Sequence, residues 1–130
     1  MLVDTERIAA VRRIARGDAK FLDTYVTAAF EELEQAIDDL RAAIRKKDAR
    51  VARDCLHIIE GTGASVGAVA LVANCKSLRE YIEVPDDPDR ASSLAELSTT
   101  YALTKSTVLA SLHSPRESTS RSGARADKMP

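Results

Sequence analysis

Apolar residues recur every three or four positions along most of the chain, and no stretch alternates polar and apolar residues with the two-residue period of a strand. A three- or four-residue spacing places apolar side chains on one face of a helix. Glycine and proline are confined to a few short segments, which mark the ends of such helices. The pattern therefore predicts an all-α fold.

The spacing predicts a short N-terminal helix followed by longer ones. Asp4 is a candidate N-cap for the first helix, and Gly17 is a candidate terminator after it. Asp18 is placed to cap a second and longest helix that runs to about Lys46. The third helix is predicted to begin near Asp48 and to fold back antiparallel on the second, because the turn between them is short.

Two further breaks complete the helical order. The segment GASVG, residues 63–67, carries two glycines and is predicted to end the third helix, with a fourth starting at about Gly67. The segment VPDDPD, residues 84–89, has the composition of a loop before the last helix. Four substantial helices with short connections predict an antiparallel four-helix bundle in up-down-up-down order, with the short first helix as an extra N-terminal element.

Each predicted helix has an apolar stripe that should face the core. The expected inward positions are Ile8, Val11 and Ile14 or Ala15 in the first helix; Leu22, Val26, Phe30, Leu33, Ile37, Leu40 and Ile44 in the second; Cys55, Ile59, Thr62 and Val66 in the third; Ala70 or Leu71, Asn74 or Cys75, Leu78 and Ile82 in the fourth; and Leu94, Leu97, Tyr101, Val108 and Leu112 in the last.

The 130 residues suit one domain, which we place at residues 4–112. Residues 113–130 contain almost nothing to bury and are predicted to form a disordered tail. His113, at the end of the last helix, is given no role beyond a favourable position near the helix carbonyls.

The charge balance and the cysteines narrow the function classes. Nineteen basic and 20 acidic residues give a net charge of −1, so neither nucleic acid nor an anionic membrane is an expected partner. No apolar run is long enough to span a bilayer and no signal-peptide core is present, which predicts a cytoplasmic protein. Cys55 and Cys75 lack the spacing of a metal or redox motif and are expected to be buried, so no metal site is predicted.

His57 lies on a different helix face from the apolar stripe. Because each helical residue advances by about 100°, it shares its face with Arg50, Arg53, Gly61 and Ala64. A glycine inside a helix costs about 1 kcal/mol relative to alanine, so Gly61 calls for a packing or access explanation. We interpret Gly61 and Ala64 as small residues that let a partner approach an exposed His57.

The stretch HIIEGTGASVGAVALVANCKSL, residues 57–78, resembles the signature of histidine-containing phosphotransfer (HPt) domains of multistep two-component signalling. The long second helix and the short turn before His57 are similar to those of the same family, so the resemblance covers roughly residues 4–112. The positions that carry it are His57, Gly61, Gly67, Ala68, Leu71, Cys75 and Leu78.

The resemblance implies that His57 accepts a phosphoryl group from the aspartyl phosphate of a receiver domain and passes it to another receiver. It also implies that response-regulator receivers are the partners, that they supply the Mg²⁺, and that the chain has no intrinsic cofactor. The domain would then be a phosphohistidine carrier rather than a self-contained enzyme. We expect it to be the C-terminal module of a hybrid sensor histidine kinase, with a free-standing shuttle as the alternative.

Glu60 stands where the family usually has lysine, three residues after the histidine. A carboxylate there would repel a phosphoryl group, which carries nearly two negative charges. Arg53, Lys76 and Arg79 are candidate cations that could replace the missing lysine, although all three also fit an ordinary solvated surface.

Two other functions stay open at this stage. One is an HPt-like docking module that binds a receiver or another protein but transfers phosphate weakly or not at all, with Glu60 as its mark. The other is a helical structural protein without phosphate chemistry, because apolar stripes of this kind are common. The small residues beside His57 favour a role in phosphotransfer over this last alternative.

Overall fold

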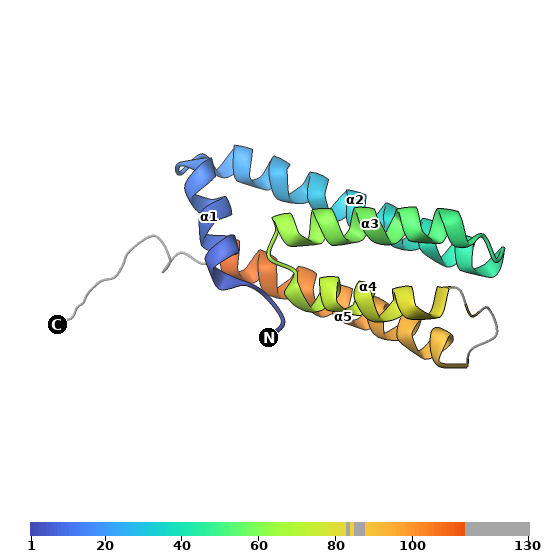
Figure 1. Cartoon of the computed structure of the whole chain (residues 1–130). Coiled ribbons are helices and arrows are strands. Elements are labelled where there is room, and N and C mark those ends of the chain that lie inside the picture. Colours follow the sequence, from blue (N-terminus) through green and yellow to red (C-terminus); the bar gives the residue numbers. More distant parts are fainter. Residues whose placement is uncertain (83, 85–87, 114–130) are drawn as a thin grey trace.

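The computed structural model of the chain describes residues 1–82, 84 and 88–113, and within them it is all helical. Two long antiparallel helices, α2 and α3, pack on a second pair, α4 and α5, and α1 crosses one end (Figure 1). This arrangement confirms the predicted bundle with an extra N-terminal helix. The helices are α1 (Thr5–Ala15), α2 (Ala19–Arg45), α3 (Ala49–Ser65), α4 (Val69–Ile82) and α5 (Pro88–Leu112).

Aspartates begin the first three helices, as the sequence predicts. The side chains of Asp4, Asp18 and Asp48 accept hydrogen bonds from backbone N–H groups in the first turns of α1, α2 and α3, at 3.0 to 3.2 Å. These bonds satisfy donors that a helix leaves without partners at its N-terminus. The positions of these capping residues therefore fix where the helices that carry the site begin.

The break between α3 and α4 depends on Gly67. Its φ of 76° is left-handed, and a Cβ at this position would lie 2.9 Å from the carbonyl oxygen of Asp4. The N–H of Asp4 in turn donates to the Gly67 carbonyl at 2.7 Å. Because Gly67 adopts this conformation, α4 begins at Val69, two residues later than the sequence prediction.

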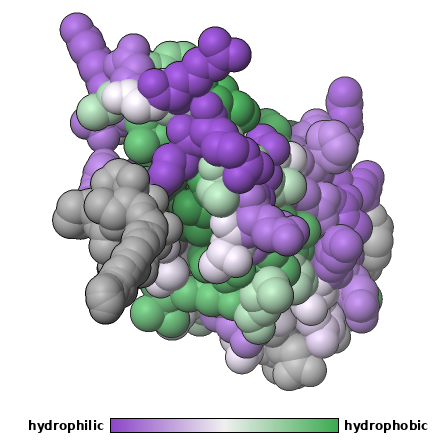
Figure 2. Space-filling model, turned by 90° about the vertical axis from the view of Figure 1, so that its left-hand side faces the viewer, coloured by the Kyte–Doolittle hydropathy of each residue, from purple (hydrophilic) through white to green (hydrophobic). Residues whose placement is uncertain are grey.

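Helix α1 joins distant segments at its end of the bundle. The Arg7 Nε donates to the Ser65 carbonyl at the end of α3 at 2.9 Å, and an Arg12 Nη2 donates to the Ser111 carbonyl near the end of α5. Figure 2 views the molecule from this end: hydrophilic side chains dominate its upper part and right side, and apolar surface shows between them. Helix α1 thus holds the far end of α3 in place.

The core follows the predicted stripes with a few corrections. Of the paired alternatives, Ala15, Leu71 and Cys75 are the buried members, and Ile14 is exposed. Thr62 was expected in the core but is only half-buried, because its hydroxyl donates a hydrogen bond to Glu32 of α2. The inner face of α3 also buries Ala52, Leu56 and Gly63.

The last helix shows a further difference from the prediction. Thr104 is fully buried on the inner face of α5, although as a polar residue it was not among the predicted core positions. Its hydroxyl has no hydrogen-bond partner within the part of the chain that the structure describes. The remaining predicted positions of α5 are buried or half-buried. The prediction therefore identified the inner face of α5 correctly but left out Thr104.

Two sequence predictions fall mostly outside the described residues. Val84 is the only position of 84–87 that the structure describes, and α5 begins at Pro88. Of the predicted tail, only His113 is described: its Nε2 lies 3.0 Å from Asp23 Oδ1 on α2. No helix within the described ranges is long and apolar enough to cross a membrane.

Candidate functional site

His57 lies in the middle of α3 with its side chain exposed. The positions predicted to share its face, Arg53, Gly61 and Ala64 among them, are exposed as well, and Cys55 and Ile59 are buried on the other side. The capped N-terminus and the buried stripe of α3 hold the helix between α2 and α4. The expected orientation of His57 is therefore confirmed.

Gly61 opens the surface one turn beyond His57. Within the described residues, a Cβ added to Gly61 would meet no atom beyond its own stretch of helix backbone within 4 Å, so no neighbouring side chain or helix there requires a glycine. Gly63 is different, because it is buried and its Cβ would touch Val72 and Leu71 of α4 at 3.5 and 3.7 Å. Among the described residues, no packing contact therefore explains Gly61, and its role in giving a partner access to His57 stays a prediction.

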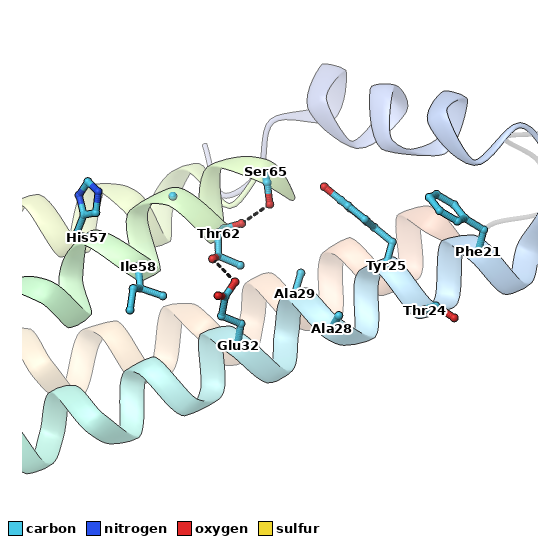
Figure 3. A pocket seen from close by; sticks show the side chains of 11 residues that line it. Phe21, Thr24, Tyr25, Ala28, Ala29, Glu32, His57, Ile58, Thr62 and Ser65 are labelled. Carbon is cyan, nitrogen blue, oxygen red and sulfur yellow. Dashed lines mark hydrogen bonds between the residues drawn. The ribbon is translucent and has the colours of Figure 1, made fainter.

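A groove of about 830 Å³ runs from His57 along the seam between α2 and α3 (Figure 3). Ile58 points from α3 toward α2 beside the histidine, and the side chain is 43% exposed. Most of the lining is apolar or small. The lining residues are Phe21, Thr24, Tyr25, Ala28, Ala29, Glu32, His57, Ile58, Gly61, Thr62 and Ser65.

Two aromatic rings form the end of the groove farthest from His57. The rings of Phe21 and Tyr25 stack with their centroids 6.4 Å apart and an interplanar angle of 20°, and Phe21 is 46% exposed. Sequence reasoning missed both as site residues. Their i,i+4 spacing beside the buried stripe of Leu22 and Val26 was the available signal, because it places two aromatic rings together outside the core.

A hydrogen bond joins the two helices within the groove. The Thr62 hydroxyl donates to Glu32 Oε1 at 2.6 Å, and the Ser65 hydroxyl donates to the Thr62 carbonyl at 2.7 Å (Figure 3). This bond explains why Thr62 is drawn out of the core toward α2. It lies between the histidine end and the aromatic end of the groove.

The opposite flank of His57, toward α4, carries an ion pair. Arg79 Nη2 of α4 donates to Glu60 Oε1 at 2.7 Å, and the side chains are 38% and 20% exposed respectively. Burial raises the pKa of the Cys75 thiol to about 12; the Glu60 charge adds to that rise and the Arg79 charge opposes it. Both charges therefore lie in the α3–α4 seam above a buried thiol.

The other two candidate cations lie on the same helices. Arg53 is exposed one turn before His57, and Lys76 is exposed on α4, one turn before Arg79. Arg79 thus pairs with Glu60, one turn after His57. The contacts with a phosphoryl group that are expected of Arg53, Lys76 and Arg79 stay predictions. Within the described ranges, no three His, Cys, Asp or Glu side chains lie together as a metal site.

The exposed histidine on a helical bundle can be compared with known families. Residues 24–107 match the profile of the Hpt domain, which covers more than half of the chain and includes the whole His57 face. The chain belongs to the Hpt domain family. The family is that of phosphotransfer domains in two-component signalling, and its partners are receiver domains. No curated protein matches the sequence.

Two solved structures share the Hpt fold. Histidine-containing phosphotransfer protein B (HptB) from Pseudomonas aeruginosa PAO1 is similar with a TM-score of 0.73 and 18% identity, over 88% of this chain and 96% of that one. A rice protein assigned as a histidine-containing phosphotransfer protein has the same TM-score and identity, over 85% and 79% of the two chains. At this identity the likeness concerns the fold alone.

Proposed function

We propose that His57 is the phosphoacceptor of this Hpt domain and relays a phosphoryl group between the aspartates of two receiver domains. The observation that carries the proposal is the exposed imidazole on α3, next to a glycine that no packing contact among the described residues requires. Membership of the Hpt domain family supplies the reaction class.

Phosphotransfer requires few groups from the Hpt domain itself. A neutral imidazole nitrogen uses its lone pair to form a bond to phosphorus, and the bond between phosphorus and the aspartate oxygen breaks, leaving a carboxylate on the receiver. The reverse reaction on a second receiver returns the imidazole. Such transfers depend on positioning and charge stabilisation, so an exposed ring on a rigid helix is sufficient on this side. The receiver would bring its own Mg²⁺.

The α2–α3 groove is the docking surface we propose for the receiver. It begins at His57, so a receiver seated on it would place its aspartate near the ring. Exposed apolar groups such as Ile58 and Phe21 are of the kind that dominate binding energy in protein interfaces. Because Gly61 and Ala64 have little or no side chain, a partner can approach the His57 ring without steric hindrance from them.

Glu60 gives little support to a docking module without phosphotransfer. That alternative depends on repulsion between the Glu60 carboxylate and the incoming phosphoryl group, and in the unphosphorylated domain the Glu60 charge is offset by Arg79. We propose Arg79 as the cation that stabilises the phosphoryl group, with Arg53 and Lys76 farther along the same surface. A hybrid sensor kinase as the parent protein stays a prediction, because the same domain would serve either a kinase or a free-standing shuttle.

Phosphotransfer from a labelled receiver tests the proposal. The protein is incubated with receivers that carry aspartyl phosphate and Mg²⁺, and the label on it should be labile to acid and stable to base, as phosphohistidine is. His57→Gln should abolish the label, whereas His113→Gln, which changes the other histidine of the chain, should leave it unchanged. Label that survives in His57→Gln, or no label from any receiver, would overturn the proposal.

A further inference from the structure

The Glu60–Arg79 ion pair places a carboxylate one helical turn after the phosphoacceptor, with a guanidinium of α4 bonded to that carboxylate. Glu60 follows His57 by three residues on α3, a spacing at which side chains are neighbours on a helix surface. The bond joins one guanidinium nitrogen to one carboxylate oxygen at 2.7 Å. A guanidinium has five N–H donors, so Arg79 can serve a second anion from the same position.

Phosphorylation of His57 would create that second anion. The phosphoryl group carries nearly two negative charges and three acceptor oxygens, and arginine binds such groups through paired hydrogen bonds. Glu60 and the phosphoryl group would then compete for one guanidinium. Breaking the pair costs little, because both side chains are partly exposed and ion pairs of this kind are weak.

We propose that Glu60 is a built-in competitor for Arg79, and that Arg79 exchanges Glu60 for the phosphoryl group when His57 is phosphorylated. The inference rests on the proposed function and adds regulation to it. Glu60 raises the free energy of the phosphorylated form, because the phosphoryl group must displace a carboxylate to gain its cation. The domain therefore holds the phosphoryl group weakly and favours its onward transfer.

A small phosphodonor tests the exchange without a receiver. Wild type, Glu60→Gln, Arg79→Gln and the double variant are incubated with potassium phosphoramidate, and the phosphohistidine fraction and its decay are followed by ³¹P NMR. Glu60→Gln should raise the fraction or lifetime about two- to fivefold, the range expected of an exposed ion pair. Glu80→Gln, an exposed acid beside Arg79 on α4, is the matched control and should change neither.

The decisive comparison is Arg79→Gln in the Glu60→Gln background. If Arg79 binds the phosphoryl group, the double variant should hold about three- to tenfold less phosphohistidine than Glu60→Gln alone. Equal levels would mean that Arg79 only neutralises Glu60, and they would overturn the inference, as would an unchanged level in Glu60→Gln. Thermal unfolding of each variant checks that the fold is retained.

A spectroscopic readout separates exchange from simple charge effects. The ¹⁵N resonance of Arg79 Nε should shift when His57 is phosphorylated, and the shift should be absent in His57→Gln; an unmoved resonance would overturn the exchange. If phosphoramidate labels His57 with these dependences but no receiver transfers to it, the proposed relay fails and the exchange stands. If neither donor labels His57, both fail.

Discussion

The two flanks of α3 differ in chemistry although they border the same histidine. Toward α2 lies a mostly uncharged groove with exposed Ile58 and an aromatic pair at its far end. Toward α4 lies the ion pair of Glu60 and Arg79 above buried Cys75. The α2 side of His57 can thus provide apolar contacts to a partner, and the α4 side can provide charge to a phosphoryl group. Affinity for a partner and retention of the phosphoryl group can therefore vary separately.

The largest expected effect comes from a charge placed in the groove. Ile58→Asp should weaken receiver binding about 30-fold or more, because an anchor of the interface would be replaced by a buried charge. Isothermal titration calorimetry with a receiver measures this effect. Val51→Asp is the matched control: Val51 is 41% exposed on the same helix but does not line the groove, and an acidic residue suits the first turn of α3.

A smaller loss of receiver affinity is expected from a substitution at the aromatic end of the groove. Phe21→Ala should weaken receiver binding about tenfold, since the ring is an exposed apolar anchor whose removal leaves the core intact. Leu103→Ala removes an exposed apolar side chain from α5 instead and should leave binding unchanged. Equal losses in the two variants would mean that the groove is not the docking surface.

Arg79→Gln sharpens the comparison from the other flank. It should change binding of an unphosphorylated receiver by less than about twofold, because a partly exposed cation outside the groove contributes little to an apolar interface. The phosphohistidine level of the same variant should fall. A tenfold loss of receiver binding would show that the two flanks do not act separately.

Gly61→Ala should have opposite effects on the stability of the fold and on the access of a receiver to His57. The variant is expected to be more stable by about 0.5 to 1 kcal/mol, because alanine is a better helix former and its methyl group would touch no neighbouring side chain or helix of the described residues within 4 Å. The same methyl group narrows the groove, so receiver binding should weaken. Urea denaturation and calorimetry measure the two effects, and Gly63→Ala, whose methyl group would lie within the α3–α4 packing, should leave binding unchanged.

The smallest expected effect is on the acid stability of the fold, and it comes from the contact between α2 and α5, away from both flanks of His57. Hydrogen bonds from Lys105 and Tyr101 hold the pKa of Glu34 below its ordinary value of 4.5. A lowered folded-state pKa gives stability that is present above the unfolded pKa and is lost as pH falls through the folded one. Because these groups are partly exposed, the loss below about pH 4.5 should be no more than about 0.5 kcal/mol.

Glu34→Gln provides the check on this pH dependence. The variant should lose the corresponding part of the acid dependence in urea denaturation measured between pH 3 and 6, with receiver binding at neutral pH unchanged. A variant that binds a receiver much more weakly would indicate that the α2–α5 seam is coupled to the groove. An unchanged acid dependence would mean that the bonds to Glu34 persist in the protonated form.

The sequence by itself determined the helices and the face that His57 occupies. The capping aspartates, the left-handed glycine and the apolar stripes act over one to four residues, so periodicity and turn chemistry are enough to find them. The exposure of His57 follows from the same local rule, because the buried stripe of α3 lies on its other side. Gly61 also stood out without a structure, as a helix-interior glycine.

Only the tertiary structure decided which side chains from different helices meet. Arg79 is 19 residues from Glu60, and Phe21 is 36 residues before His57, so no local pattern joins either pair. Thr62 left the predicted core for the same reason, since its partner Glu32 belongs to another helix. The rotation and register of packed helices depend on how all their side chains interlock, and this fixed both flanks of His57.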